Sequence, residues 1–263
     1  GVGPFPRIEV AGAAVATVSA QLVVMLVMMV GVFRSKKEEN VLKGIRLFEP
    51  FSKEELGNIC KIGGPTAIQG MVYCMISMVL TRMVAAFGAE AIATQRVGGQ
   101  IESVSWNTAD GFAAALNAFV GQNYGAKKMD RVQKGYRISF WTVAIWGALI
   151  MLAFIIFPGP IAGVFFHEEK AMEIAISYLI IIGFSEAFMC VELMTIGALS
   201  GLGKTKLCSV ISITATSMRI PLAMVLSRTS LGLDGIWWAL TLTSVAKGII
   251  FYLTFRYQMR EKC

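Results

Sequence analysis

The feature that most constrains this chain is a succession of long apolar runs, separated by short segments rich in Gly, Pro and charge. An apolar run of about 20 residues is long enough to cross a bilayer as an α-helix. Of the 263 residues, 56% are hydrophobic and only 16% are charged, which leaves too little polar surface for a soluble domain of this length. The pattern predicts an all-α, polytopic membrane protein with about seven transmembrane helices. The expected ranges are 10–33, 57–86, 91–120, 132–157, 171–199, 206–228 and 233–256.

The second of these helices has a clear start signal, because Ser52 is followed three residues later by Glu55 in a capping-box pattern. The basic residues then give an orientation. If the first helix enters the cytoplasm, 17 Lys and Arg residues lie in cytoplasmic segments and three lie outside. Cytoplasmic loops carry such an excess, so we predict a cell-membrane protein with a cytoplasmic C-terminus. The net charge of +7 is thereby explained without a nucleic-acid partner.

Residue types that build metal or catalytic sites are scarce. The chain has one histidine, His167, and its five cysteines show no CxxC or other metal-ligand spacing. Zinc sites and His-based catalysis both require such residues at suitable positions. We therefore expect no metal site, no catalytic residue, no enzyme cofactor and no enzymatic activity.

Charged residues nevertheless occur at membrane depth, where each charge costs at least about 2.5–3.5 kcal/mol. The acids are Glu102, Asp110, Glu186 and Glu192, and the bases are Arg82, Arg96, Arg219 and Lys247. One interpretation is that these charges pair off as structural salt bridges, with Arg219 and Lys247 as the deep partners. The alternative is that one or two acids stay unpaired and bind H⁺ or Na⁺, or attract a cationic solute. Glu102 and Glu186 are the best candidates for this role, because both lie near mid-membrane.

Polar and aromatic residues near these charges indicate a substrate cavity. At 100° per residue, Gln95 and Trp106 share a stripe with Glu102 on helix 91–120. The rings of Trp106 and Tyr73 are suited to stack on an aromatic cation, although ordinary packing explains them equally well. A second polar stripe on helix 206–228 leads toward the helix-kinking Pro221, and its members are Ser209, Ser212, Thr216 and Arg219.

Four motifs follow one another along the chain in a characteristic order. The most specific are GFAAALNAFVGQNYGAKKMDRV at 111–132, where a helix ends in V-G-Q-x-x-G-A-K, and MTIGALSGLGKTK at 194–206. The other two are KIGGPTAIQG at 61–70 and AGAAVATVSAQ at 11–21. Together these motifs resemble segments of the multidrug and toxic compound extrusion (MATE) family, and they extend over almost the whole chain.

The resemblance implies a transporter with two six-helix lobes, which form a V around a central cavity. Such a transporter exports organic cations and other amphiphiles in exchange for Na⁺ or H⁺. On this comparison, residues 1–33 are the last helix of the N-terminal lobe, 34–56 are a cytoplasmic inter-lobe loop, and 57–263 are the C-terminal six-helix lobe. The expected partners are a small amphiphilic or cationic drug-like substrate, membrane lipid, and an N-terminal lobe of the same protein that this chain lacks.

One helix departs from the family pattern. In one branch of the family, the cation site of this lobe uses a glutamate in the helix that corresponds to 57–86. Here the polar residues of that helix are Gln69 and Tyr73, which we take as candidates for the substrate cavity. Either Glu186 replaces the missing glutamate, or coupling relies on an aspartate outside this chain, so the coupling ion stays open.

Two other functions also stay open. A lipid-linked oligosaccharide flippase of the same superfamily would need a strongly cationic cavity, whereas the deep charges here are balanced, four and four. A seven-helix receptor or signalling protein would fit the number of spans. The G-Q-x-x-G-A-K turn and the long basic first cytoplasmic loop argue against a receptor.

Overall fold

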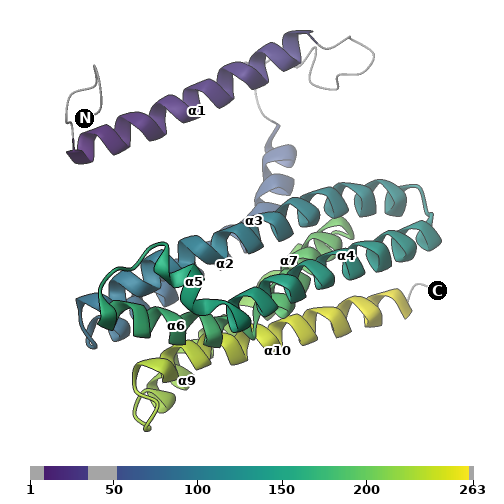
Figure 1. Ribbon diagram of the computed structural model, residues 1–263. Coiled ribbons are helices and arrows are strands. Elements are labelled where there is room, and N and C mark those ends of the chain that lie inside the picture. Colours follow the sequence, from purple (N-terminus) through teal and green to yellow (C-terminus); the bar gives the residue numbers. More distant parts are fainter. Residues whose placement is uncertain (1–8, 35–51, 261–263) are drawn as a thin grey trace. The chain divides into compact units, whose positions relative to one another are not determined.

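The computed structural model describes residues 9–34 and 52–260, and these residues form helices joined by short turns, with no β-strand among them. The chain divides into two compact units, residues 1–55 and 56–263. In the first unit, α1 (Glu9–Arg34) is one continuous helix (Figure 1). Most of its large apolar side chains are exposed, among them Leu22, Met28 and Phe33. The predicted loop 34–56 falls mainly on residues 35–51, which lie outside the described residues.

From Lys53 onward the chain forms a bundle of helices of very different lengths (Figure 1). They are α2 (Lys53–Ala85), α3 (Ala89–Gly125), α4 (Met129–Ile156), α5 (Pro158–Gly163), α6 (Glu169–Gly183), α7 (Glu186–Gly201), α8 (Thr205–Ser217), α9 (Arg219–Leu226) and α10 (Leu233–Arg260). At the start of α2, the Glu55 N–H donates to Ser52 Oγ at 3.1 Å and the Ser52 N–H donates to Glu55 Oε2 at 3.2 Å. These reciprocal bonds confirm the predicted capping box.

Five segments of the described chain are long and apolar enough to cross a membrane, and six if α6 and α7 count as one bent span. The five are Ala14–Arg34, Lys53–Ala85, Met129–Ile156, Thr205–Leu226 and Leu233–Arg260. Helix α3 is not among them, although its 37 residues extend over about 55 Å. Polar residues such as Glu102 and Asp110 lower its hydropathy. With α3 included, the structure has the seven membrane-length segments that the sequence predicts.

Two of the predicted spans are each divided into two helices. The span predicted at 171–199 bends by 50° between α6 and α7. The span predicted at 206–228 is interrupted at Met218, between α8 and α9. Pro221 accounts for the second break, because proline has no N–H to donate to the carbonyl of Ser217 four residues earlier. The residues that begin the helices after these breaks, Glu186 of α7 and Arg219 of α9, are both buried.

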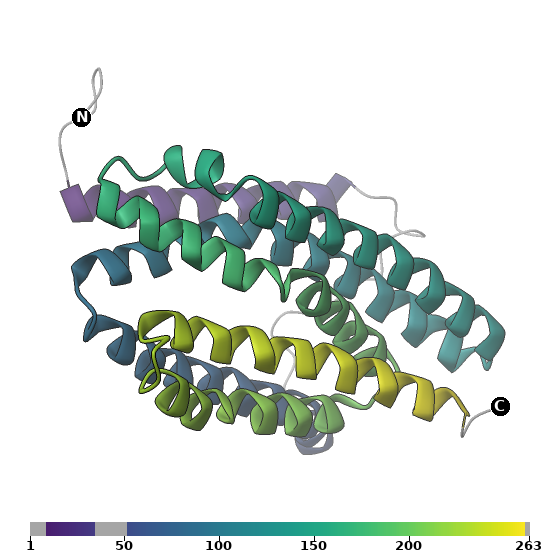
Figure 2. The same ribbon diagram turned by 60° about the horizontal axis from the view of Figure 1, so that its bottom comes forward.

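Helix α7 lies at the centre of the second unit, with α3 and α4 on one side and α10 on the other (Figure 1, Figure 2). Glycines make these contacts close. A Cβ on Gly197 of α7 would overlap the backbone of Ala113 in α3, and one on Gly147 of α4 would lie 2.7 Å from the Ala187 Cα. Gly248 of α10 also lies directly against the α7 backbone. Such small residues allow membrane helices to pack through their backbones.

Candidate functional site

A cavity of about 490 Å³ lies within the second unit, among α2, α3, α7, α8, α9 and α10. Both aromatic candidates line it, and Tyr73 and Trp106 are 54% and 39% exposed, so each presents ring surface to a ligand. Of the ten residues that the sequence suggested as coupling, cavity or charge-partner residues, seven line this cavity: Gln69, Tyr73, Trp106, Asp110, Glu192, Arg219 and Lys247. The other three, Gln95, Glu102 and Glu186, lie outside its lining.

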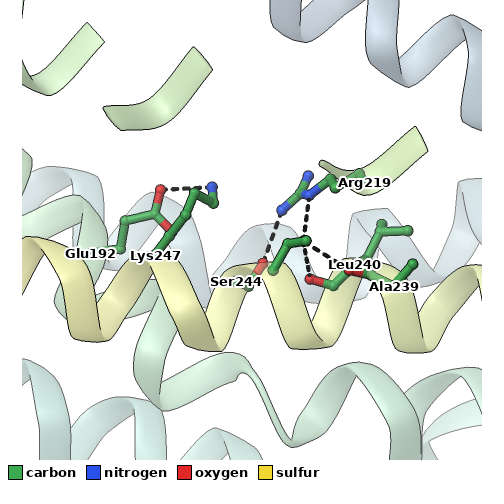
Figure 3. A network of polar contacts seen from close by, with 7 residues as sticks. Glu192, Arg219, Ala239, Leu240, Ser244 and Lys247 are labelled. Atoms are coloured by element: carbon green, nitrogen blue, oxygen red, sulfur yellow. Dashed lines mark hydrogen bonds and ion pairs between the residues drawn. The ribbon is translucent and has the colours of Figure 1, made fainter. Parts of the chain in front are cut away.

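Glu192 on α7 and Lys247 on α10 form a buried ion pair on one wall of the cavity (Figure 3). The Lys247 Nζ donates to Glu192 Oε1 at 2.7 Å, and the two side chains are only 9% and 6% exposed, respectively. The second carboxylate oxygen, Oε2, is buried without a hydrogen-bond partner. The pair neutralises both charges and connects two central helices, so its loss would leave a buried charge uncompensated.

The guanidinium of Arg219 is held by hydroxyl groups instead of a carboxylate (Figure 3). Its Nε donates to Thr243 Oγ1 at 3.0 Å, and its Nη2 donates to Ser244 Oγ at 2.9 Å. The Thr243 hydroxyl donates its own proton to the carbonyl of Ala239, at 2.8 Å, or of Leu240, at 2.9 Å. The hydroxyl oxygen is therefore oriented as an acceptor for the arginine. No carboxylate of the described residues lies within 4.0 Å of Arg219.

Glu102 on α3 accepts a hydrogen bond from the hydroxyl of Tyr178 on α6. The Tyr178 ring lies directly over Gly98, one turn earlier on α3, where a Cβ would overlap the ring. On its other side the ring packs edge-on against Trp237 of α10, with the ring centroids 5.0 Å apart. Tyr178 is 4% exposed, so a buried phenol both positions the Glu102 carboxylate and limits its access to water.

Glu186 is the first residue of α7, directly after the bend that separates α6 from α7. It is fully buried, and neither of its carboxylate oxygens has a hydrogen-bond partner. Its polar neighbours are Ser105 and Glu102, both close enough to interact with it electrostatically. The Ser105 hydroxyl is also within hydrogen-bond distance of the Cys190 sulfur, at 3.3 Å. Two carboxyl groups from α3 and α7 thus share one interior region, an arrangement that favours binding of a proton or a small cation.

The interpretation in which all deep charges pair off is wrong. Of the four deep acids and four deep bases, which all lie in the described part of the chain, only Glu192 and Lys247 form an ion pair. Arg82, Arg96 and Asp110 are exposed. The same part of the chain contains no group of three or more His, Cys, Asp or Glu side chains that could hold a metal ion.

The hydroxyl partners of Glu102 and Arg219 were not predicted from the sequence. Tyr178, Thr243 and Ser244 lie in apolar helices, where hydroxyl residues are common and no local pattern distinguishes these three. They become partners of Glu102 and Arg219 only because helices distant in sequence meet. In contrast, the predicted polar stripe is buried throughout, with Ser209, Ser212 and Thr216 on α8 and Arg219 at the start of α9. Three of its members, Ser212, Thr216 and Arg219, line the cavity.

Comparison with known proteins agrees with this architecture. The model of the MatE family matches residues 65–225. The chain is 28% identical over 265 residues to a probable multidrug resistance protein, NorM, of Thermotoga maritima, covering 97% of this chain and 55% of that protein. It is 25% identical over 255 residues to an FAD transporter of Shewanella oneidensis, covering 96% of this chain and 55% of that protein. The chain spans about half the length of the curated relatives it matches.

A solved structure of a MATE protein in its straight conformation has the same fold. The TM-score is 0.82 at 21% sequence identity, and the match covers 95% of this chain and 56% of that chain. The all-α membrane fold predicted from the sequence is thereby confirmed.

Proposed function

The chain belongs to the MatE family, and from this premise we propose that it forms part of a secondary-active multidrug exporter. Members of the family are multi-pass transporters of the cell membrane and not enzymes, which rules out the receptor hypothesis. The exporter moves amphiphilic molecules and organic cations out of the cell, in exchange for Na⁺ or H⁺, by alternating access. The observation that carries this proposal is the cavity of about 490 Å³, whose lining combines aromatic rings with both signs of charge.

In this proposal, residues 57–263 are the C-terminal lobe of the transporter, 34–56 the loop between the lobes, and 1–33 the last helix of the N-terminal lobe. The half-length match to the relatives supports this assignment. The excess of Lys and Arg in the loops that would be cytoplasmic supports a cytoplasmic C-terminus. A complete transporter also requires the N-terminal lobe, because the cavity of the family lies between two lobes.

Glu102 and Glu186 are the proposed coupling residues. Two carboxylates that share a buried region repel each other when both are ionised, and a proton or Na⁺ between them removes this repulsion. Glu186 lies at the bend between α6 and α7, so occupancy of the site can bias the angle at that bend. An ion can drive the conformational change only if it binds one state better than the other. Asp110 and Glu192 are weaker candidates, since Asp110 is exposed and Glu192 is paired with Lys247.

A lipid-linked oligosaccharide flippase is the alternative within the same superfamily. It would require a strongly cationic cavity, whereas two acids, Asp110 and Glu192, and two bases, Arg219 and Lys247, line this one. The balance of charges favours the exporter.

Neutralising each proposed coupling residue tests the function. Glu102→Gln and Glu186→Gln, each made in the transporter with both lobes, should abolish ion-driven export of ethidium from proteoliposomes. The amount of folded protein in the membrane should stay unchanged. Glu168→Gln, at an exposed position beside α6, is the matched control and should export at the normal rate. If both carboxylate variants export as fast as the control, neither residue couples ions to transport.

A further inference from the structure

We propose that Arg219 is an anion-binding point of the cavity, so that the cavity accepts, besides organic cations, molecules that carry a carboxylate on an aromatic or apolar body. This inference rests on the proposed transport function, because it names the class of molecule that the cavity accepts. It also extends that function, since only a ligand with an anionic group would provide Arg219 with a counter-charge.

Arg219 has hydrogen-bonding capacity that the protein does not use. A guanidinium has five N–H donors, and two of them, on Nε and Nη2, donate to Thr243 and Ser244. No acceptor among the described residues takes the other three, two of which belong to Nη1. The edge formed by Nη1 and Nη2 is the geometry that binds a carboxylate through two parallel hydrogen bonds. The two hydroxyls fix the neighbouring edge formed by Nε and Nη2, so the group is held in place before a ligand arrives.

Of the two bases that line the cavity, Lys247 has a carboxylate partner and Arg219 does not. Lys247 lines the same wall, but Glu192 neutralises it at 2.7 Å. Glu102 is near enough to interact electrostatically with Arg219, yet it lies beyond ion-pair distance and is hydrogen-bonded to Tyr178. Arg219 is only 8% exposed, so a carboxylate bound there would be largely shielded from water, where a charged hydrogen bond is strongest.

A further unpartnered polar group, the Ser212 hydroxyl, lines the same cavity as Arg219. Ser212 lies two turns earlier and is 4% exposed. Buried hydroxyls are normally hydrogen-bonded, so a ligand oxygen would satisfy this one. Thr216, between the two, adds a third donor-bearing side chain to the lining. With the rings of Tyr73 and Trp106 in the same cavity, the lining suits an aromatic carboxylate.

A matched pair of ligands tests the inference by binding alone. Dansylglycine and its methyl ester share the aromatic body and differ in the carboxylate, and both can be titrated by fluorescence against the purified transporter in detergent. We expect the acid to bind about tenfold or more tightly than the ester, the range of a charge-assisted hydrogen bond. Arg219→Gln should remove this preference while leaving the affinity for the ester unchanged. Arg228→Gln, at an exposed position outside the cavity, should keep the preference.

Two further variants decide the question if Arg219→Gln does not fold. Arg219→Lys keeps the positive charge but cannot donate two parallel hydrogen bonds to a carboxylate. Ser244→Ala removes one of the two hydroxyls that hold the guanidinium. Each variant should reduce the preference for the acid. Equal binding of acid and ester by the unchanged protein, or equal weakening of both ligands in these variants, overturns the inference. A protein that exports ethidium but does not distinguish acid from ester keeps the proposed function and loses this subsite. Selective binding of the acid without any export would instead contradict the proposed function.

Discussion

Removing the ammonium group of Lys247 tests what the buried ion pair on the cavity wall contributes to stability. Lys247→Met preserves the length of the side chain but removes the donor to Glu192 Oε1. Since Glu192 Oε2 has no hydrogen-bond partner either, the whole carboxylate is then left without one. Breaking a buried pair from one side costs about 3–5 kcal/mol. Since the pair borders a cavity, water can reach the carboxylate, and we expect the lower end, about 3 kcal/mol. That is roughly a hundredfold increase in the unfolding equilibrium constant.

The double variant Glu192→Gln/Lys247→Met removes both charges and should lie within about 1 kcal/mol of the unchanged protein. The exposed pair of Lys170 and Glu90 provides the matched control, with 3.6 Å between Nζ and Oε1 and side chains 73% and 35% exposed. Lys170→Met should cost less than about 1 kcal/mol. The free energy of unfolding can be measured in mixed micelles by circular dichroism. The buried pair contributes no more than a surface pair if Lys247→Met lowers the free energy of unfolding no more than Lys170→Met does. The same conclusion follows if the double variant is as unstable as the single variant.

Two further outcomes follow from close contacts. Gly197→Ala should destabilise the bundle by about 1–3 kcal/mol through overpacking of α7 against Ala113. Gly111→Ala is the control and should leave stability unchanged, because a Cβ there meets nothing within 4 Å. Equal losses in the free energy of unfolding for the two variants would contradict the overpacking of α7 against α3. Tyr178→Phe removes the donor to Glu102 and should slow ion-driven ethidium export. Tyr136→Phe is the control, because it removes a buried hydrogen bond to Thr195 that lies away from Glu102. It should lower the free energy of unfolding by about 1 kcal/mol and leave export unchanged. If export slows in Tyr136→Phe but not in Tyr178→Phe, the role of Tyr178 is refuted.

The positions of the helices follow from local properties of the chain. Apolar runs between charged turns fixed all seven spans to within a few residues, because a helix in lipid must satisfy its backbone internally. The part of the polar stripe from Ser209 to Thr216 could likewise be predicted, since these residues belong to one helix, α8, and share a face according to their spacing alone. The bend before Glu186 was not predicted, because no proline directly precedes it and the Ser185 that caps α7 makes no side-chain capping bond.

By itself, the sequence determined that this protein is a bundle of membrane helices with acids and bases at depth. It also identified which residues those were. Only the tertiary structure decided how each charge is satisfied: Lys247 by a carboxylate 55 positions away, Arg219 by two hydroxyls of α10, Glu102 by a tyrosine of α6, and Glu186 by no hydrogen bond. The physical reason is that a charge in a low-dielectric interior depends on groups within a few ångströms. Those neighbours are set by how separate helices pack and not by the spacing of residues along one helix.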